Sequence, residues 1–152
     1  MQLPREVIVG DKTLELIGDI CKKLDFSESA LVVTGPQTCR IAGKKTIDLL
    51  EDKGISVESM VVSSSAMKDV EVVEEKVAEF GPQVILGIGG GTKIDVAKLS
   101  SAHKGVPFMS IPTTASHDGI ASPLVSIKEL NKPYSVMAQS PMAIIVDTDI
   151  II

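Results

Sequence analysis

The chain has 152 residues, which is enough for one domain with its own hydrophobic core. Its net charge of −5 and its lack of any basic cluster argue against nucleic acid as a partner, because neutralising phosphates requires grouped Lys and Arg. The longest apolar run near a terminus, residues 143–146, is too short to cross a bilayer, and the N-terminus has no signal-peptide pattern, so we expect a cytoplasmic protein with no membrane partner.

The N-terminal third of the chain contains two apolar runs, each followed by an amphipathic segment. Residues 6–9 are a strand candidate that ends at Gly10, and Asp11 or Thr13 is the expected cap of a helix that runs to about Leu24. The next predicted elements are a strand at residues 30–33, a tight turn at 34–36, and a helix that carries Ile41, Ile47, Leu49 and Leu50 and ends at Gly54.

A second unit repeats this pattern. Its predicted elements are a strand at residues 55–62, a helix at 69–80 with Val70, Val73, Val77 and Phe80 facing inward, a strand at 83–88, a helix at 92–103 and a strand at 106–111. Strands that alternate with helices over short connections are typical of a parallel sheet with helices on both faces. The scarcity of aromatic residues, at 3%, also suits buried parallel strands rich in Val and Ile.

The pattern changes after Pro112. Residues 124–128 and 134–138 predict a hairpin, and residues 143–146 predict a last core strand. No linker or repeat divides the chain. We therefore predict one α/β domain over residues 1–152, with a Rossmann-like parallel sheet, helices on both faces and a small β-hairpin near the C-terminus.

The two cysteines, Cys21 and Cys39, do not have the spacing of a metal site. Two interpretations are open: a disulfide, or two reduced and partly buried thiols. The expected cytoplasmic location favours reduced thiols.

Three consecutive glycines join a predicted strand to a predicted helix, in the sequence GIGGGTKIDVAK of residues 87–98. Glycines allow the backbone to approach a ligand closely, and the helix N-terminus behind them offers unpaired N–H groups to a pyrophosphate. We expect Thr92 to cap this helix in a capping-box-like pair with Asp95. The spacing is neither that of the common dinucleotide fingerprint nor that of a P-loop. A tight turn without a ligand is the alternative, although a single glycine would satisfy it.

A second polar segment, IPTTASHDGIASP at residues 111–123, follows a predicted strand and so lies where open α/β sheets bind ligands. It has four hydroxyl-bearing residues, His117 and Asp118; a polar loop without function is the alternative. Elsewhere, residues 34–37 follow a strand without an acid to hold a ribose 2′-hydroxyl, which is compatible with NADPH and NADH. Residues 63–65 and Lys68 either supply donors to the adenine end or form a solvated loop.

The glycine segment resembles the G-x-G-G-G-x-x-x-D-x-A-K motif of the superfamily that contains glycerol dehydrogenase, iron-activated alcohol dehydrogenases and dehydroquinate synthase. The segment PTTASHDGIASP resembles the corresponding loop of the glycerol-1-phosphate dehydrogenase family within it. This resemblance implies that the phosphates of NAD(P) bind at Gly89, Gly90, Gly91 and Thr92. Asp95 matches a later position of the motif and has either a binding or a structural role. Thr113 and Thr114 are implied to contact the cofactor phosphates or ribose. The resemblance also implies that Asp118 lies beside the nicotinamide and substrate, that Ser122 contacts the carboxamide and that Leu124 packs against the ring. His117 is either a base or metal ligand, or a hydrogen-bonded neighbour.

The resemblance implies reduction of dihydroxyacetone phosphate to sn-glycerol 1-phosphate by NADPH or NADH, for archaeal ether-lipid synthesis. It covers only the N-terminal, NAD(P)-binding half of a family member, so we expect the zinc ligands, one Asp and two His, in a helical C-terminal half beyond Ile152. The complete enzyme is expected to be a homo-oligomer. Two alternatives are a nucleotide-binding module without catalysis, and a glycerol dehydrogenase that acts on unphosphorylated polyol.

Overall fold

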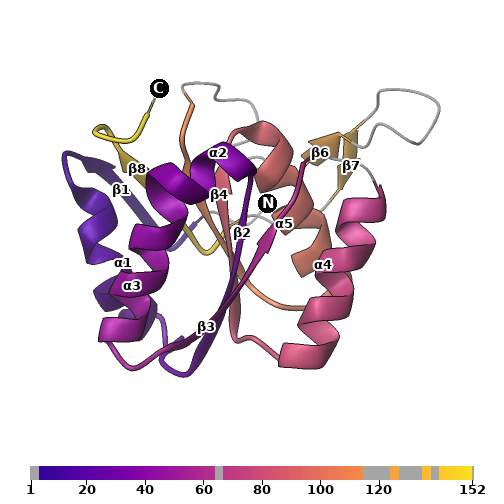
Figure 1. The fold of residues 1–152 in the computed structure, drawn as a ribbon, viewed down its shortest axis with the longest axis horizontal. Helices are drawn as coiled ribbons and strands as arrows, with labels where there is room; N and C mark the ends of the chain where they lie inside the picture. The colour runs from indigo at the N-terminus through magenta and orange to yellow at the C-terminus, as the bar shows by residue number, and fades with distance from the viewer. Residues whose placement is uncertain (1–3, 64–66, 115–123, 127–134, 138–140, 152) are drawn as a thin grey trace.

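The computed structural model has a parallel sheet between two layers of helices, as the sequence predicts (Figure 1). It describes residues 4–63, 67–114, 124–126, 135–137 and 141–151. In spatial order, the six strands of the sheet are β1 (Glu6–Gly10), β8 (Ala143–Asp147), β5 (Phe108–Pro112), β4 (Val84–Gly89), β2 (Ser29–Thr34) and β3 (Ser56–Val61). All neighbouring pairs in this sheet are parallel.

The helices differ in length and in type. In chain order they are the 3₁₀ helix η1 (Thr13–Leu16), α1 (Ile17–Lys23), the short α2 (Pro36–Thr38), the π-helical turn η2 (Cys39–Gly43), α3 (Lys44–Asp52), α4 (Met67–Phe80) and α5 (Gly91–Lys104). No helix within the described ranges is both long enough and apolar enough to cross a membrane. Two strands of the predicted hairpin lie within the described residues, β6 (Leu124–Ser126) and β7 (Ser135–Met137), and they pair antiparallel.

Each face of the sheet carries its own hydrophobic core, because successive side chains of a strand point to opposite faces. On one face, Val32 of β2 lies in a cluster with Leu14 of η1 and Leu50 of α3. On the other face, Leu31 of β2 lies in a cluster with Val73 of α4. All five side chains are fully buried, and burial of each such side chain contributes about 1.5–3 kcal/mol. The helices thereby hold the carboxyl ends of the strands in fixed positions.

The start of the first helix differs from the prediction that Asp11 or Thr13 caps it. Lys12 precedes η1 with a left-handed φ of 57°, and no side chain caps the helix from that position. Instead, the buried carboxylate of Asp147 accepts hydrogen bonds from the backbone N–H groups of Lys12, at 3.2 Å, and Leu14, at 2.9 Å. The acceptor comes from the end of β8, 133 residues from Leu14, where a local sequence pattern does not reach.

Two other helices also differ from their predictions. The helix expected after β2 is interrupted by the π-helical turn, and Ile41 within that turn is exposed. In α4, the predicted inward residues Val70, Val73 and Val77 are buried. Phe80 was predicted to face inward as well, but it is only half-buried because the helix ends there.

Both cysteines are free thiols, as the reduced interpretation predicts. Cys21 is buried with its Sγ 3.8 Å from Sδ of Met109, and burial raises the pKa of its thiol to about 12, whereas Cys39 is partly exposed. At pH 8 we expect iodoacetamide to modify Cys39 and to leave Cys21 unmodified, because the reactive thiolate of Cys21 forms only at much higher pH. Peptide mass spectrometry checks this expectation. Equal labelling of both cysteines in the folded protein would show that Cys21 is accessible after all.

Candidate functional site

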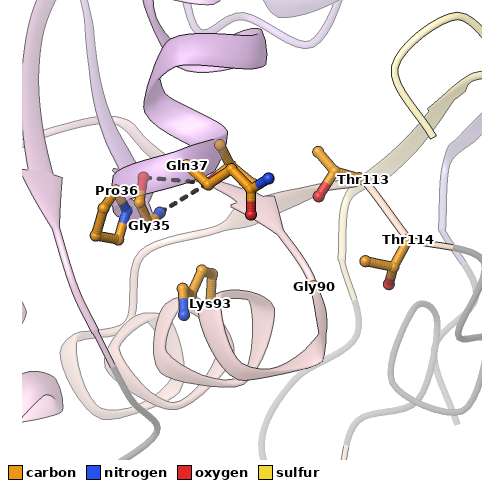
Figure 2. A pocket seen from close by; sticks show the side chains of 8 residues that line it. Gly35, Pro36, Gln37, Gly90, Lys93, Thr113 and Thr114 are labelled. Carbon is orange, nitrogen blue, oxygen red and sulfur yellow. Dashed lines mark hydrogen bonds between the residues drawn. The ribbon is translucent and has the colours of Figure 1, made fainter. Parts of the chain in front are cut away.

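A pocket lies at the carboxyl end of the sheet, where β2, β4 and β5 end (Figure 2). The order of the strands reverses here, because the chain passes from β2 outward to β3 and then returns to place β4 on the other side of β2. Such a reversal is the usual ligand position in an open α/β sheet. The pocket has a volume of about 370 Å³ and is lined by Gly35, Pro36, Gln37, Thr38, Gly90, Lys93, Thr113 and Thr114.

The loop after β2 forms one wall of the pocket and is held by its own hydrogen bonds. The backbone N–H of Gly35 donates to the hydroxyl oxygen of Thr38 at 2.8 Å. The same oxygen lies 3.3 Å from the carbonyl oxygens of Gly35 and Ile88, to either of which the hydroxyl can donate. The N–H of Cys39 donates to the carbonyl of Gly35 at 2.9 Å. This wall is therefore formed by the chain itself and is tied to the neighbouring strand β4.

The junction between β4 and α5 forms the floor of the pocket. Gly90 precedes α5 in extended conformation, and its carbonyl accepts a hydrogen bond from the N–H of Ile94 at 3.2 Å. No side chain caps the helix, so the predicted capping box of Thr92 and Asp95 is wrong. The helix begins at Gly91, one residue earlier than predicted, and Thr92 is its second residue. The N–H groups in the first turn of α5 therefore donate no hydrogen bond to an N-cap side chain.

The loop after β5 forms the opposite wall. The N–H of Thr113 donates to the carbonyl of Gly89 at 2.9 Å, which joins this wall to β4. Thr113 and Thr114 lie across the pocket from Pro36 and Lys93 (Figure 2). Three separate loops thus meet around one space because the carboxyl ends of parallel strands share an edge.

Some of the predicted site residues come together in this pocket, and others do not. Gly90, Thr113 and Thr114 line it. Gly89 is the last residue of β4, Gly91 is exposed at the start of α5, and Thr92 and Asp95 are half-buried on α5 outside the lining. Asp118, Ser122 and His117 lie outside the described residues, and Leu124 belongs to β6, whose backbone alone is described.

Lys93 was not among the predicted site residues, although it is the charged residue that lines the pocket. Its stem crosses two glycines: a Cβ added to Gly89 would lie 2.8 Å from Cγ of Lys93, and a Cβ added to Gly35 would overlap its Cε. The signal that could have identified Lys93 is its position in the first turn of the helix. The Cα–Cβ bonds of a helix tilt toward its N-terminus, which here faces the pocket.

Lys98, two turns into α5, has no exposed surface and does not line the pocket. Burial lowers the pKa of its ammonium group, and the negative charge of Asp95 opposes that shift. Neither of these two motif residues is among the residues that line the pocket.

Two relatives match nearly the whole chain. It is 48% identical over 151 residues to the glycerol-1-phosphate dehydrogenase [NAD(P)+] of Methanosarcina acetivorans, and 44% identical over 152 residues to the protein of the same name from Thermococcus kodakarensis. Both matches cover 99% of this chain. The chain spans 42% of the first relative's length and 43% of the second's.

Solved structures share the fold. Glycerol dehydrogenase from Schizosaccharomyces pombe matches 99% of this chain and 39% of its own with a TM-score of 0.86, at 25% identity. NADH-dependent butanol dehydrogenase A from Thermotoga maritima matches 99% of this chain and 44% of its own with a TM-score of 0.87. At 17% identity, the second likeness is one of fold alone.

The family profile described as iron-containing alcohol dehydrogenase matches residues 8–152. This match includes every strand of the sheet except the start of β1, and it includes all three loops that form the pocket. The chain belongs to the iron-containing alcohol dehydrogenase family.

Proposed function

We propose that this chain is the nucleotide-binding part of an NAD(P)-dependent glycerol-1-phosphate dehydrogenase, which reduces dihydroxyacetone phosphate to sn-glycerol 1-phosphate. The observation that carries the proposal is the 48% identity to the Methanosarcina acetivorans protein of that name over 99% of the chain. The pocket supports it independently, because it lies where α/β sheets bind dinucleotides.

The described residues fit the pyrophosphate of such a cofactor. Gly90 has no side chain between the backbone and the pocket, and the uncapped N-terminus of α5 offers N–H groups and partial positive charge to an anion. Thr113 and Thr114 present hydroxyls from the opposite wall that can donate to phosphate or ribose oxygens. In this proposal Gly89, Gly91 and Thr92 complete the phosphate loop, and Asp95 supports the helix behind it.

The nicotinamide end rests on the family resemblance of residues 111–123. A bound nicotinamide supplies the hydride, and the chain binds and orients it. We propose that Asp118 lies beside the nicotinamide and the substrate, that Ser122 contacts the carboxamide and that Leu124 packs against the ring.

The metal of this family needs ligands that the described residues do not form. Within residues 4–63, 67–114 and the described segments after them, no three His, Cys, Asp or Glu side chains are grouped closely enough to hold a metal ion. We propose that the metal is zinc and that its ligands belong to a C-terminal half corresponding to the remaining length of the relatives. We expect the complete enzyme to be a cytoplasmic homo-oligomer that serves archaeal ether-lipid synthesis.

Two measurements on the same sample test the proposed function. Fluorescence titration with NADPH and NADH measures whether the chain binds a nicotinamide cofactor. Absorbance at 340 nm then follows NADPH oxidation, in the presence of zinc, after dihydroxyacetone phosphate or unphosphorylated dihydroxyacetone is added. We expect cofactor binding, and oxidation with the phosphorylated substrate in a sample that holds both halves.

The outcomes separate the alternatives. Oxidation with unphosphorylated dihydroxyacetone alone would favour a glycerol dehydrogenase, the activity in the name of the 25% identical Schizosaccharomyces pombe protein. Cofactor binding without oxidation in a sample that holds both halves would favour a nucleotide-binding protein without this activity. An absence of binding to either cofactor would refute the nucleotide site.

A further inference from the structure

The pocket contains a cation that the proposed function leaves unexplained. Of the eight lining residues, Lys93 is charged and the other seven are neutral. Among the described residues, no carboxylate forms an ion pair with the Lys93 ammonium group. A cation that faces a pocket without an acidic neighbour is suited to an anionic group of a ligand.

The position of Lys93 indicates which part of a ligand it meets. A Cβ added to Gly35 would lie 3.4 Å from Nζ of Lys93, so the ammonium group is beside the loop that follows β2. Figure 2 shows Lys93 on the same side of the pocket as Gly35 and Pro36, with Thr113 and Thr114 on the opposite side. The cation therefore lies on the β2 side of the pocket.

In dinucleotide-binding sheets, the adenosine ribose of the cofactor binds on the corresponding side of the site. When the pyrophosphate lies at a glycine turn before a helix, the adenosine ribose lies toward the end of the neighbouring strand. An acid there accepts a hydrogen bond from the 2′-hydroxyl of NADH, whereas a basic residue accommodates the 2′-phosphate of NADPH. Here the loop of residues 35–38 after β2 has no acid, and Lys93 brings a positive charge to the same place.

We infer that Lys93 binds the 2′-phosphate of NADPH and is the residue that makes this protein prefer NADPH to NADH. The inference rests on the proposed nucleotide site. It goes further by naming the residue that discriminates between the two cofactors. Gly35 has a positioning part, because any side chain at that position would displace the end of Lys93.

Dissociation constants for NADPH and NADH, measured by fluorescence titration, test this assignment. Lys93→Gln keeps a long polar side chain and removes the charge. It is expected to weaken NADPH binding at least about tenfold and NADH binding less than about threefold. Lys93→Arg should retain the NADPH preference. The matched control is Lys104→Gln, which removes a charge from the exposed far end of the same helix and should change neither constant.

A second variant tests the same site from the facing loop. In Gly35→Asp, the added side chain would displace the end of Lys93, because its Cβ would overlap the present position of Cε, and its carboxylate would pair with the shifted ammonium group and repel a 2′-phosphate. NADPH binding should weaken at least about tenfold while NADH binding is kept. Because Gly35 has a φ of −101° and a ψ of 174°, aspartate is accommodated without backbone strain.

Three results would overturn the inference. If Lys93→Gln weakens the binding of NADPH and NADH equally, Lys93 contacts a part of the molecule that the two cofactors share. If NADPH binding is unchanged, Lys93 contacts neither NADPH nor NADH. Either result leaves the nucleotide site intact. If the unaltered protein binds neither cofactor, the proposed function fails and the inference fails with it.

Discussion

Replacing Asp147 with alanine is expected to lower the free energy of unfolding by about 3 kcal/mol, because buried donors that lose their acceptor pay a large desolvation cost. The side chain is 1% exposed. Its carboxylate accepts hydrogen bonds from the backbone N–H groups of Lys12 at 3.2 Å, Leu14 at 2.9 Å and Asp149 at 2.9 Å. One side chain thus joins the end of β8 to the start of η1 and also orders the turn that follows β8.

Urea denaturation monitored by circular dichroism measures this loss. Asp147→Asn keeps a single acceptor oxygen and should cost about half as much, roughly 1–2 kcal/mol. Asp149→Ala removes the same charge from an exposed side chain nearby, and its effect should stay within about 0.5 kcal/mol. A loss below about 1 kcal/mol in Asp147→Ala would show that the three hydrogen bonds contribute little.

The predicted parts of the fold are those that local sequence patterns determine. The apolar run at residues 30–33 forms the centre of β2, where all four side chains have no exposed surface. A run of this kind is stable only when both faces of a strand are covered, which already requires helices on both sides. The alternation of strands and helices then leaves few ways to connect them, because parallel crossovers are right-handed.

The same logic accounts for the part of the site that was predicted. Gly90 follows β4, and Thr113 and Thr114 follow β5. Since these strands are parallel neighbours, residues just beyond their carboxyl ends meet at one edge. Their positions in the sequence are therefore enough to predict that these residues lie close together.

The parts that were missed depend on contacts between distant segments. Asp147 caps η1 although it lies 133 residues from Leu14, and no local sequence pattern in either segment predicts this contact. Lys93 faces Gly35, 58 positions earlier, and their contact depends on the close approach that Gly35 and Gly89 permit. The predicted start of α5 was wrong by one residue, because the sequence does not show which of several consecutive glycines is the first helical residue. In the structure it is Gly91.

Gly90→Val is expected to weaken the binding of both NADPH and NADH by at least about a hundredfold, equivalent to about 2.7 kcal/mol, without unfolding the protein. Gly90 has a φ of −81° and a ψ of −172°, an extended conformation that valine adopts readily. A Cβ at this position would lie 3.5 Å from Cγ2 of Thr114, which is ordinary contact. The two further methyl groups of valine would then fill the space between Gly90 and Thr114 where a phosphate is proposed to lie.

The matched control is Ala78→Val, because Ala78 is exposed on α4 and does not line the pocket. Titration of both variants with NADPH and NADH, alongside thermal unfolding, separates a blocked site from a damaged fold. If Gly90→Val keeps its affinity for both cofactors, the phosphate must bind elsewhere. If both valine variants lose affinity equally while remaining folded, the loss does not come from the gap between Gly90 and Thr114, and the proposed phosphate position is refuted.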